Sequence, residues 1–267
     1  MKPINIVQGI LPVVLCFPHS GVYVPDAVYD NMNDRGKALA DTDWHVDRLY
    51  DGLLPGASII RANFHRYVID ANRDPSGKSL YPGKNTTGLV PVIDFDGENI
   101  WQIQPSLKDI DIRRARYHAP YHQAIENELK RVREKHGVAL LYDCHSIRSH
   151  VPMFFSGALP DFNIGTNDGR ACDKSFEQIA AKICENVPPY SSVTNGRFKG
   201  GWTTRHYGRP AENLHAIQME LSQSVYMKQQ EPPWQMDTEK SNKVRIVLRQ
   251  LLQALTEQAL QLARSKN

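Results

Sequence analysis

The sequence is poor in cysteine and has no block of like charge. Its 267 residues include only four cysteines, with no CxxC spacing, which excludes zinc sites built from paired CxxC motifs. The formal charge is only +3, and without a Lys/Arg-rich run the chain offers little to a nucleic-acid partner. In a chain of this length with no secretory signal we expect free thiols rather than disulfides. The four cysteines are Cys16, Cys144, Cys172 and Cys184.

Long hydrophobic runs are also missing. The N-terminal segment, residues 1–20, contains an apolar stretch that is interrupted by Gln8, Gly9 and Pro12 and followed directly by His19. It is too short to span a bilayer and has no small-residue cleavage site. We therefore expect it to hold a core strand, and the chain to be a cytoplasmic protein with no membrane partner.

The short motifs that identify common hydrolases and nucleotide-binding enzymes are absent. There is no HExxH, no GxSxG and no Walker phosphate loop in the sequence. Ten histidines are more than average usage suggests, which favours metal or acid–base chemistry.

What the sequence does contain is an alternation of strand-like and helix-like segments. Short, continuously apolar runs are typical of strands buried on both faces, and helical periodicity lies between them. This order predicts an α/β protein with a largely parallel sheet flanked by helices, and with no linker we expect a single domain over residues 1–267. The strand candidates are 12–17, 58–60, 67–70, 138–143 and 216–221, and the helix candidates are 40–53, 121–136, 175–187 and 238–265.

Three long segments have little periodicity and are rich in Gly, Pro, Asn or Arg: 74–99, 156–171 and 195–213. Loops of that length in a compact domain are usually functional. We expect them to border a binding site.

Polar side chains gather where the predicted strands end. His19 follows the run 12–17, Asn72 and Arg73 follow 67–70, and His145 follows 138–143. In open α/β sheets, ligands bind outside the carboxyl ends of the strands. Each of these residues alone has an ordinary structural explanation, but together they favour a metal-assisted hydrolase.

Glu220 is harder to explain structurally, because it lies inside the apolar run AIQMEL. A carboxylate is costly to bury unless it is paired or functional. The segment DTDWHVD at 41–47 adds three carboxylates and an imidazole at the start of a predicted helix, where a single Asp would usually be a cap.

Cys144 and His145 are neighbours, so alternation along the strand separates them. If pairing continues through residue 145, Asp143 and His145 share one side and Cys144 points to the other. Cys144 is then a core residue rather than a nucleophile. Metal ligation by His145 fits better, and histidine with carboxylate suits Zn²⁺, which in catalytic sites keeps three protein ligands and a water.

Eight ordered segments give the sequence a resemblance to the N-formylglutamate amidohydrolase family over nearly its whole length. The segments are FPHSGVYVP (17–25), DTDWHVD (41–47), IDANRDPSG (69–77), YHAPYH (117–122), DCHS (143–146), LPDFNIGTNDG (159–169), GRFKGGWTTRHYG (196–208) and QMELSQ (218–223).

The resemblance implies a zinc-carboxypeptidase-like (phosphorylase/hydrolase-like) fold with a mixed sheet. It implies His19 and His145 as metal ligands, Glu220 as general base and Asn72 with Arg73 as a clamp for a substrate carboxylate. The short HxxE pattern is missing, because Val22 stands three residues after His19.

The middle ligand must then come from elsewhere, and segment 41–47 is the nearest source. Asp43 is favoured over Asp41, and His45 is a further alternative. Arg148 is expected to border the metal in a catalytic role, and Arg205 to bind a second substrate carboxylate.

The implied reaction is hydrolysis of N-formyl-L-glutamate to L-glutamate and formate, the last step of one route of histidine degradation. The implied cofactor is one divalent metal, with Zn most favoured and Co, Mn or Fe as alternatives. The partner is then a small dicarboxylate.

Three other functions remain open from the sequence. One is a related metal-dependent deacylase of another N-acyl amino acid, such as an acylglutamate or acylaspartate. The second is a cysteine hydrolase using Cys144, and the third is a non-catalytic protein that binds dicarboxylates.

Overall fold

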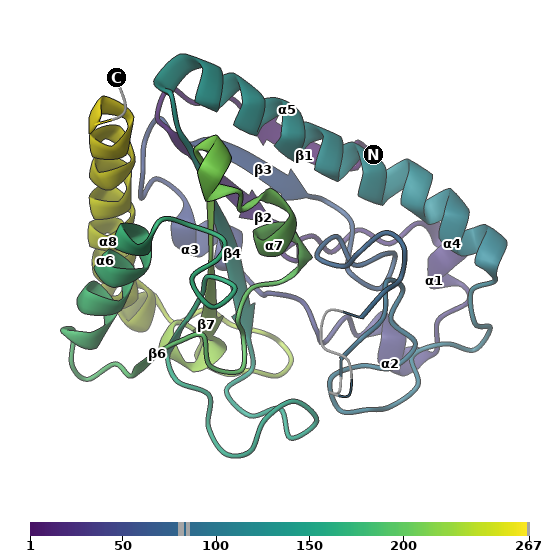
Figure 1. The fold of residues 1–267 in the computed structure, drawn as a ribbon. Coiled ribbons are helices and arrows are strands. Elements are labelled where there is room, and N and C mark those ends of the chain that lie inside the picture. Colours follow the sequence, from purple (N-terminus) through teal and green to yellow (C-terminus); the bar gives the residue numbers. More distant parts are fainter. Residues whose placement is uncertain (80–82, 84–85, 266–267) are drawn as a thin grey trace.

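The computed structural model describes residues 1–79, 83 and 86–265, and it is built on one seven-stranded mixed sheet (Figure 1). The strand order is β1-β3-β2-β4-β7-β5-β6. Neighbouring strands are parallel except for the pairs β1–β3 and β5–β7. The strands are β1 (Ile4–Val7), β2 (Val13–Phe17), β3 (Ser58–Ala62), β4 (Ala139–Ile147), β5 (Phe162–Gly165), β6 (Ser192–Thr194) and β7 (Leu214–Ser222).

Helices cover both faces of this sheet, as the sequence predicts. Helix α5 (Ala119–His136) packs on one face, and α8 (Thr238–Ser265) and α6 (Lys174–Glu185) lie beside each other on the opposite face (Figure 1). The remaining elements are shorter and sit at the rims. They are α1 (Asp26–Tyr29), α2 (Asp34–Lys37), α3 (Val46–Tyr50), α4 (Leu107–Arg113), α7 (Trp202–Tyr207), a π-helical turn (Arg114–His118) and 3-10 turns (Pro210–Glu212 and Gln223–Val225).

Alternating side chains of the central strands feed two hydrophobic cores. In β2, Val13, Leu15 and Phe17 join the core under α8, while Val14 and Cys16 join the core under α5. Burial on both faces removes the polar alternation of a surface strand, which is why β2 and the first half of β4 are continuously apolar in sequence.

The predicted strand at 67–70 is wrong. His65 to Val68 form a turn closed by a hydrogen bond from Val68 N to His65 O at 2.9 Å, and Ile69 and Asp70 follow it outside any strand. The side chains of residues 67–70 are nevertheless fully buried. A short apolar run indicates that a segment is buried, but it does not distinguish a buried strand from a buried turn.

The helix expected at 40–53 is also shorter than predicted, since α3 contains only Val46–Tyr50. His45, its N-cap, has a left-handed backbone with φ of 60°, so residues 41–45 form turns rather than a helical end. Two of the aperiodic segments hold short elements: β5 lies within 156–171 and α7 within 195–213. Part of segment 74–99, residues 80–82 and 84–85, lies outside the described residues.

Among the helices that the structure describes, none has the length and apolar composition that crossing a membrane requires.

Candidate metal centre

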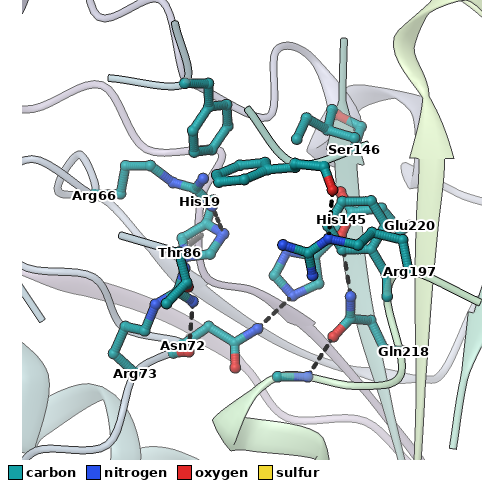
Figure 2. Close-up of a pocket in the computed structure, with 15 residues that line it drawn as sticks. His19, Arg66, Asn72, Arg73, Thr86, His145, Ser146, Arg197, Gln218 and Glu220 are labelled. Carbon is teal, nitrogen blue, oxygen red and sulfur yellow. Dashed lines mark hydrogen bonds between the residues drawn. The ribbon is translucent and has the colours of Figure 1, made fainter. Parts of the chain in front are cut away.

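The carboxyl ends of β2, β4 and β7 bring the predicted polar residues to one edge of the sheet. His145 is paired in register with Glu220 on the neighbouring parallel strand, and His19 lies just beyond the end of β2. All three line one pocket (Figure 2). Strand pairing through residue 147 therefore confirms the predicted orientation of His145.

His19 and His145, which line this pocket, converge with the buried Asp43 on one point. One candidate ligand atom from each residue lies within 4.8 Å of the other two, and all three side chains are buried. Asp43 Oδ2 is 3.1 Å from His145 Nδ1 and 3.8 Å from His19 Nδ1. The backbone N–H of Ser146 donates to the same carboxylate oxygen at 3.1 Å, which fixes its direction.

The structure brings Asp43, rather than Asp41 or His45, into this group. Asp41 accepts a hydrogen bond from Phe95 N at 3.0 Å, and the His45 ring lies 2.7 Å from Trp234 O. Both are directed to other partners by the turn that precedes α3.

Each histidine is held from behind by a buried aspartate. His19 Nε2 is 2.7 Å from Asp70 Oδ1, and His145 Nε2 is 3.1 Å from Asp143 Oδ2. A carboxylate that accepts the Nε2–H fixes the tautomer and leaves Nδ1 as the atom for the metal. In the structure Nδ1 of His19 accepts a hydrogen bond from Arg66, which a bound metal would have to replace. Paired His–carboxylate units of this kind are typical of metal sites.

The donor set fits a divalent metal. Donors bound to one ion at about 2.0–2.2 Å lie roughly 3–4 Å apart, close to the separations seen here. Two imidazoles and one carboxylate are the ligands of many catalytic zinc sites. Four buried carboxylates also crowd this region, against two adjacent arginines, Arg66 and Arg73, so a dication would offset excess negative charge. The four are Asp43, Asp70, Asp143 and Glu220.

Glu220 is a further buried carboxylate that lines the same pocket. Its Oε2 accepts a hydrogen bond from Gln218 Nε2 at 3.0 Å, and it lines the pocket. Burial raises the pKa of Glu220 to about 8, although His145 acts in the opposite direction. A bound cation would favour the ionised carboxylate, the form able to accept a proton.

The imidazole pKa values respond to the same surroundings. Burial and the neighbouring Arg66 lower the pKa of His19 to about 4. Burial also disfavours charge on His145, but Asp143 outweighs it and holds that pKa well above the usual range. In the ion-free site His145 therefore carries a proton that a metal would have to displace.

Asn72 and Arg73 lie where the sequence predicts, at the wall of the pocket. Asn72 Oδ1 accepts from Thr203 N at 2.9 Å, and its amide lies 3.0 Å from His145 Nε2. The Arg73 guanidinium donates to Thr87 O and Thr87 Oγ1, both at 2.9 Å. The pair is thus fixed in place beside the metal ligands.

Arg148 and Arg205 are placed elsewhere, outside the described lining of this pocket. Arg148 donates to Asp96 at 2.7 Å, and Arg205 donates to Gly200 O at 2.9 Å. Their expected roles stay predictions.

Two arginines that the sequence does not single out also line this pocket, Arg66 and Arg197. Arg197 stands in segment 196–208, which also contains Arg205.

Cys144 points away from the pocket into the core under α8. It is fully buried, and burial raises the pKa of its thiol well above the usual range. A neutral, inaccessible thiol is not a nucleophile. The geometry thus disfavours the cysteine-hydrolase alternative.

Comparison with known proteins agrees with these features. The profile of the N-formylglutamate amidohydrolase family matches residues 11–227. The chain is 44% identical to the N-formylglutamate deformylase of Pseudomonas putida, over 95% of this chain and 96% of that protein. It is 43% identical to the enzyme of that name from Pseudomonas aeruginosa, over 93% and 94% of the two chains.

Solved structures agree in fold. The crystal structure of N-formylglutamate amidohydrolase from Ralstonia eutropha JMP134 matches with a TM-score of 0.77 at 23% identity, covering 99% of this chain and 98% of that one. A protein from Agrobacterium tumefaciens matches with a TM-score of 0.69 at 17% identity, covering 98% and 96%. On the sequence match across most of its length, the chain belongs to the N-formylglutamate amidohydrolase family.

Proposed function

We propose that this protein is a metal-dependent N-formylglutamate deformylase, which hydrolyses N-formyl-L-glutamate to L-glutamate and formate in histidine degradation. The observation that carries the proposal is the buried His19–Asp43–His145 group with Glu220 beside it in an arginine-lined pocket. The relatives named N-formylglutamate deformylase support the choice of substrate.

His19, Asp43 and His145 would hold the metal, and Zn²⁺ is the ion that this donor set favours, with Co²⁺, Mn²⁺ and Fe²⁺ as alternatives. When bound, the ion supplies a Lewis acid for the formyl oxygen and lowers the pKa of water at the site. Asp70 and Asp143 would accept the Nε2 protons of the two imidazoles and hold the rings in orientation, which would leave each Nδ1 to the metal.

Glu220 acts as the general base in this proposal. Its carboxylate takes the proton of the attacking water and passes it to the departing amine of glutamate. Gln218 holds one carboxylate oxygen, which orients the group toward the pocket.

Asn72 and Arg73 would bind the carboxylate next to the scissile amide. Arg73 presents a planar guanidinium, the preferred bidentate partner of a carboxylate, and its contacts with Thr87 prevent it from swinging away. The adjacent Asn72 contributes an amide that is already ordered by α7 through Thr203 N.

The test is a formate-release assay with metal analysis. N-Formyl-L-glutamate should be hydrolysed, chelation should abolish turnover, and returned Zn²⁺ should restore it. N-Acetyl-L-glutamate serves as the matched substrate, because it differs by one methyl group at the acyl carbon. Comparable rates on both would favour the broader N-acyl deacylase, and binding without turnover in the presence of metal would favour a dicarboxylate-binding protein.

A further inference from the structure

N-Formyl-L-glutamate carries two carboxylates, and the following inference rests on the proposed function. Three arginines line the pocket: Arg66, Arg73 and Arg197. Figure 2 shows Arg66 and Arg73 on one side, whereas Arg197 enters from the side of Gln218 and Glu220. Cations on facing walls suit a ligand with an anionic group at each end.

Arg66 interacts with two of the predicted metal ligands, His19 and Asp43. It is buried, donates a hydrogen bond to His19 Nδ1 and lies 3.5 Å from Asp43 Oδ1. Its guanidinium also stacks 5.0 Å from the ring centre of Phe95. Its charge therefore offsets those of the buried aspartates.

The carboxylate of Asp70 lies between Arg73 and the predicted metal ligand His19. Arg73 Nη1 is 3.7 Å from Asp70 Oδ2, and the other oxygen of Asp70 holds His19. The α-carboxylate of the substrate is separated from the scissile nitrogen by a single carbon, so its cation must lie close to the metal ligands. Arg73 meets that requirement.

Arg197 has a different setting, at an apolar wall. Its Nε donates to Phe154 O at 2.8 Å, and its guanidinium lies 5.4 Å and 5.5 Å from the ring centres of Phe154 and Phe198. Both phenylalanines also line the pocket. Stacking between aromatic faces fixes the plane of the guanidinium, which suits recognition of a carboxylate.

Two backbone hydrogen bonds hold the segment that follows Arg197 against opposite sides of the site, at Gln218 and at Asn72. Gly201 N donates to Gln218 Oε1 at 2.7 Å, and Thr203 N donates to Asn72 Oδ1 at 2.9 Å. A Cβ on Gly201 would lie 2.3 Å from the Asn72 amide, so the backbone here can approach closely only because residue 201 is glycine. The base of the Arg197 side chain is thus set relative to both Asn72 and Glu220.

We propose that Arg197, rather than Arg205, binds the side-chain carboxylate of the substrate and selects N-formyl dicarboxylic amino acids over neutral ones. Its wall faces that of Arg73, so a glutamyl group can span the pocket with its reacting amide near the metal ligands. The apolar rings of Phe154 and Phe198 line the same wall and offer contact to the intervening methylenes.

The experiment compares kcat/KM for N-formyl-L-glutamate with that for N-formyl-L-glutamine, which has the same length and a neutral side chain. In Arg197→Met, the preference for glutamate should fall by about 10- to 100-fold, the effect expected when one charged hydrogen-bonded partner is lost. Arg73→Met should weaken both substrates together, because both keep the α-carboxylate. Arg170→Met, an exposed arginine paired with Asp168, is the matched control and should leave the ratio unchanged.

Failure of this inference is distinct from failure of the proposed function. A wild-type enzyme without formate release from N-formyl-L-glutamate would contradict the function itself. An active wild type with an unchanged ratio in Arg197→Met, or a ratio lost in Arg205→Met instead, would overturn only the role of Arg197. Metal content and thermal midpoint are measured for each variant. If Arg197→Met does not fold, Arg197→Lys decides the matter, since losing the planar fork should still reduce the ratio and an unchanged ratio would refute the assignment.

Discussion

Replacing Asp70 by Asn should weaken metal binding without unfolding the protein. Asp70 is fully buried, and its Oδ1 accepts hydrogen bonds from Asn72 N at 2.8 Å and from His19 Nε2 at 2.7 Å. The Asn oxygen can accept both bonds, so the local backbone should persist. What is lost is the negative charge that makes the bond to His19 strong and the imidazole a better ligand.

The expected loss is about 10- to 100-fold in metal affinity, the usual effect of removing such a partner, or about 1.4–2.7 kcal/mol. A second cost falls on stability. Asp70 Oδ2 has no hydrogen-bond partner among the described residues and lies 3.7 Å from Arg73 Nη1, so the new NH₂ group would face another donor. An unpaired buried donor costs about 1–3 kcal/mol.

The assay is competition against a chromophoric chelator, with thermal unfolding of the metal-free protein measured in parallel. Asp173→Asn is the matched control, because Asp173 caps α6 through Ser175 N and Asn is an equally good cap. Its metal affinity should equal that of the wild type. An Asp70→Asn variant that folds and binds metal within twofold of the wild type would refute the role given to Asp70.

Three further predictions concern the same centre. Glu220→Gln keeps the shape of the side chain but cannot accept a proton, so kcat should fall by roughly 10²-fold or more with metal content unchanged; loss of the metal would instead make Glu220 a ligand. Cys144→Ala should retain most activity and lower only the thermal midpoint, since it removes a small buried side chain; a fall of several decades in kcat in a folded, metal-loaded variant would contradict this. Metal affinity should rise with pH, because Asp143 keeps His145 protonated and a metal that binds this ligand must expel its proton. Calorimetry in buffers of different ionisation enthalpy should detect proton release, and a pH-independent affinity without proton release would exclude His145 as a ligand.

The stability of the metal-free protein should also depend on pH, because Glu220 has a different pKa in the folded and unfolded states. Glu220 holds its proton to about pH 8 in the folded state but only to its ordinary value of 4.5 when unfolded. The folded state therefore binds more protons between these limits, and the contribution of this group to stability is lost as pH rises through them. Metal should restore most stability at the alkaline end.

The sequence by itself determined the central strands and the three longest helices, α5, α6 and α8. Continuous apolar runs at 12–17, 138–143 and 216–221 correspond to β2, β4 and β7, and helical periodicity at 238–265 matches α8 residue for residue. These segments are decided by burial and local periodicity, which the order of residues carries directly. Alternation along β4 was equally local, and it separated His145 from Cys144 correctly.

Only the tertiary structure decided which polar side chains meet. Asp43 joins the metal ligands and Asp41 does not, because the turn ending at His45, with its left-handed backbone, directs the two carboxylates to different partners. Asp70 reaches His19 across 51 positions, from a turn that the sequence presents as a strand. Such contacts depend on register and turn geometry, which single-sequence periodicity does not encode.

The arginines illustrate the same limit. Arg197 and Arg205 stand in one motif with similar charge, and the sequence offers no means to tell which faces the pocket. In the structure, α7 begins at Trp202 and directs Arg205 back to Gly200 O, while the preceding loop carries Arg197 to the wall formed by Phe154 and Phe198. The direction of the backbone determines which of the two arginines reaches the pocket, and that direction is set only when the chain folds.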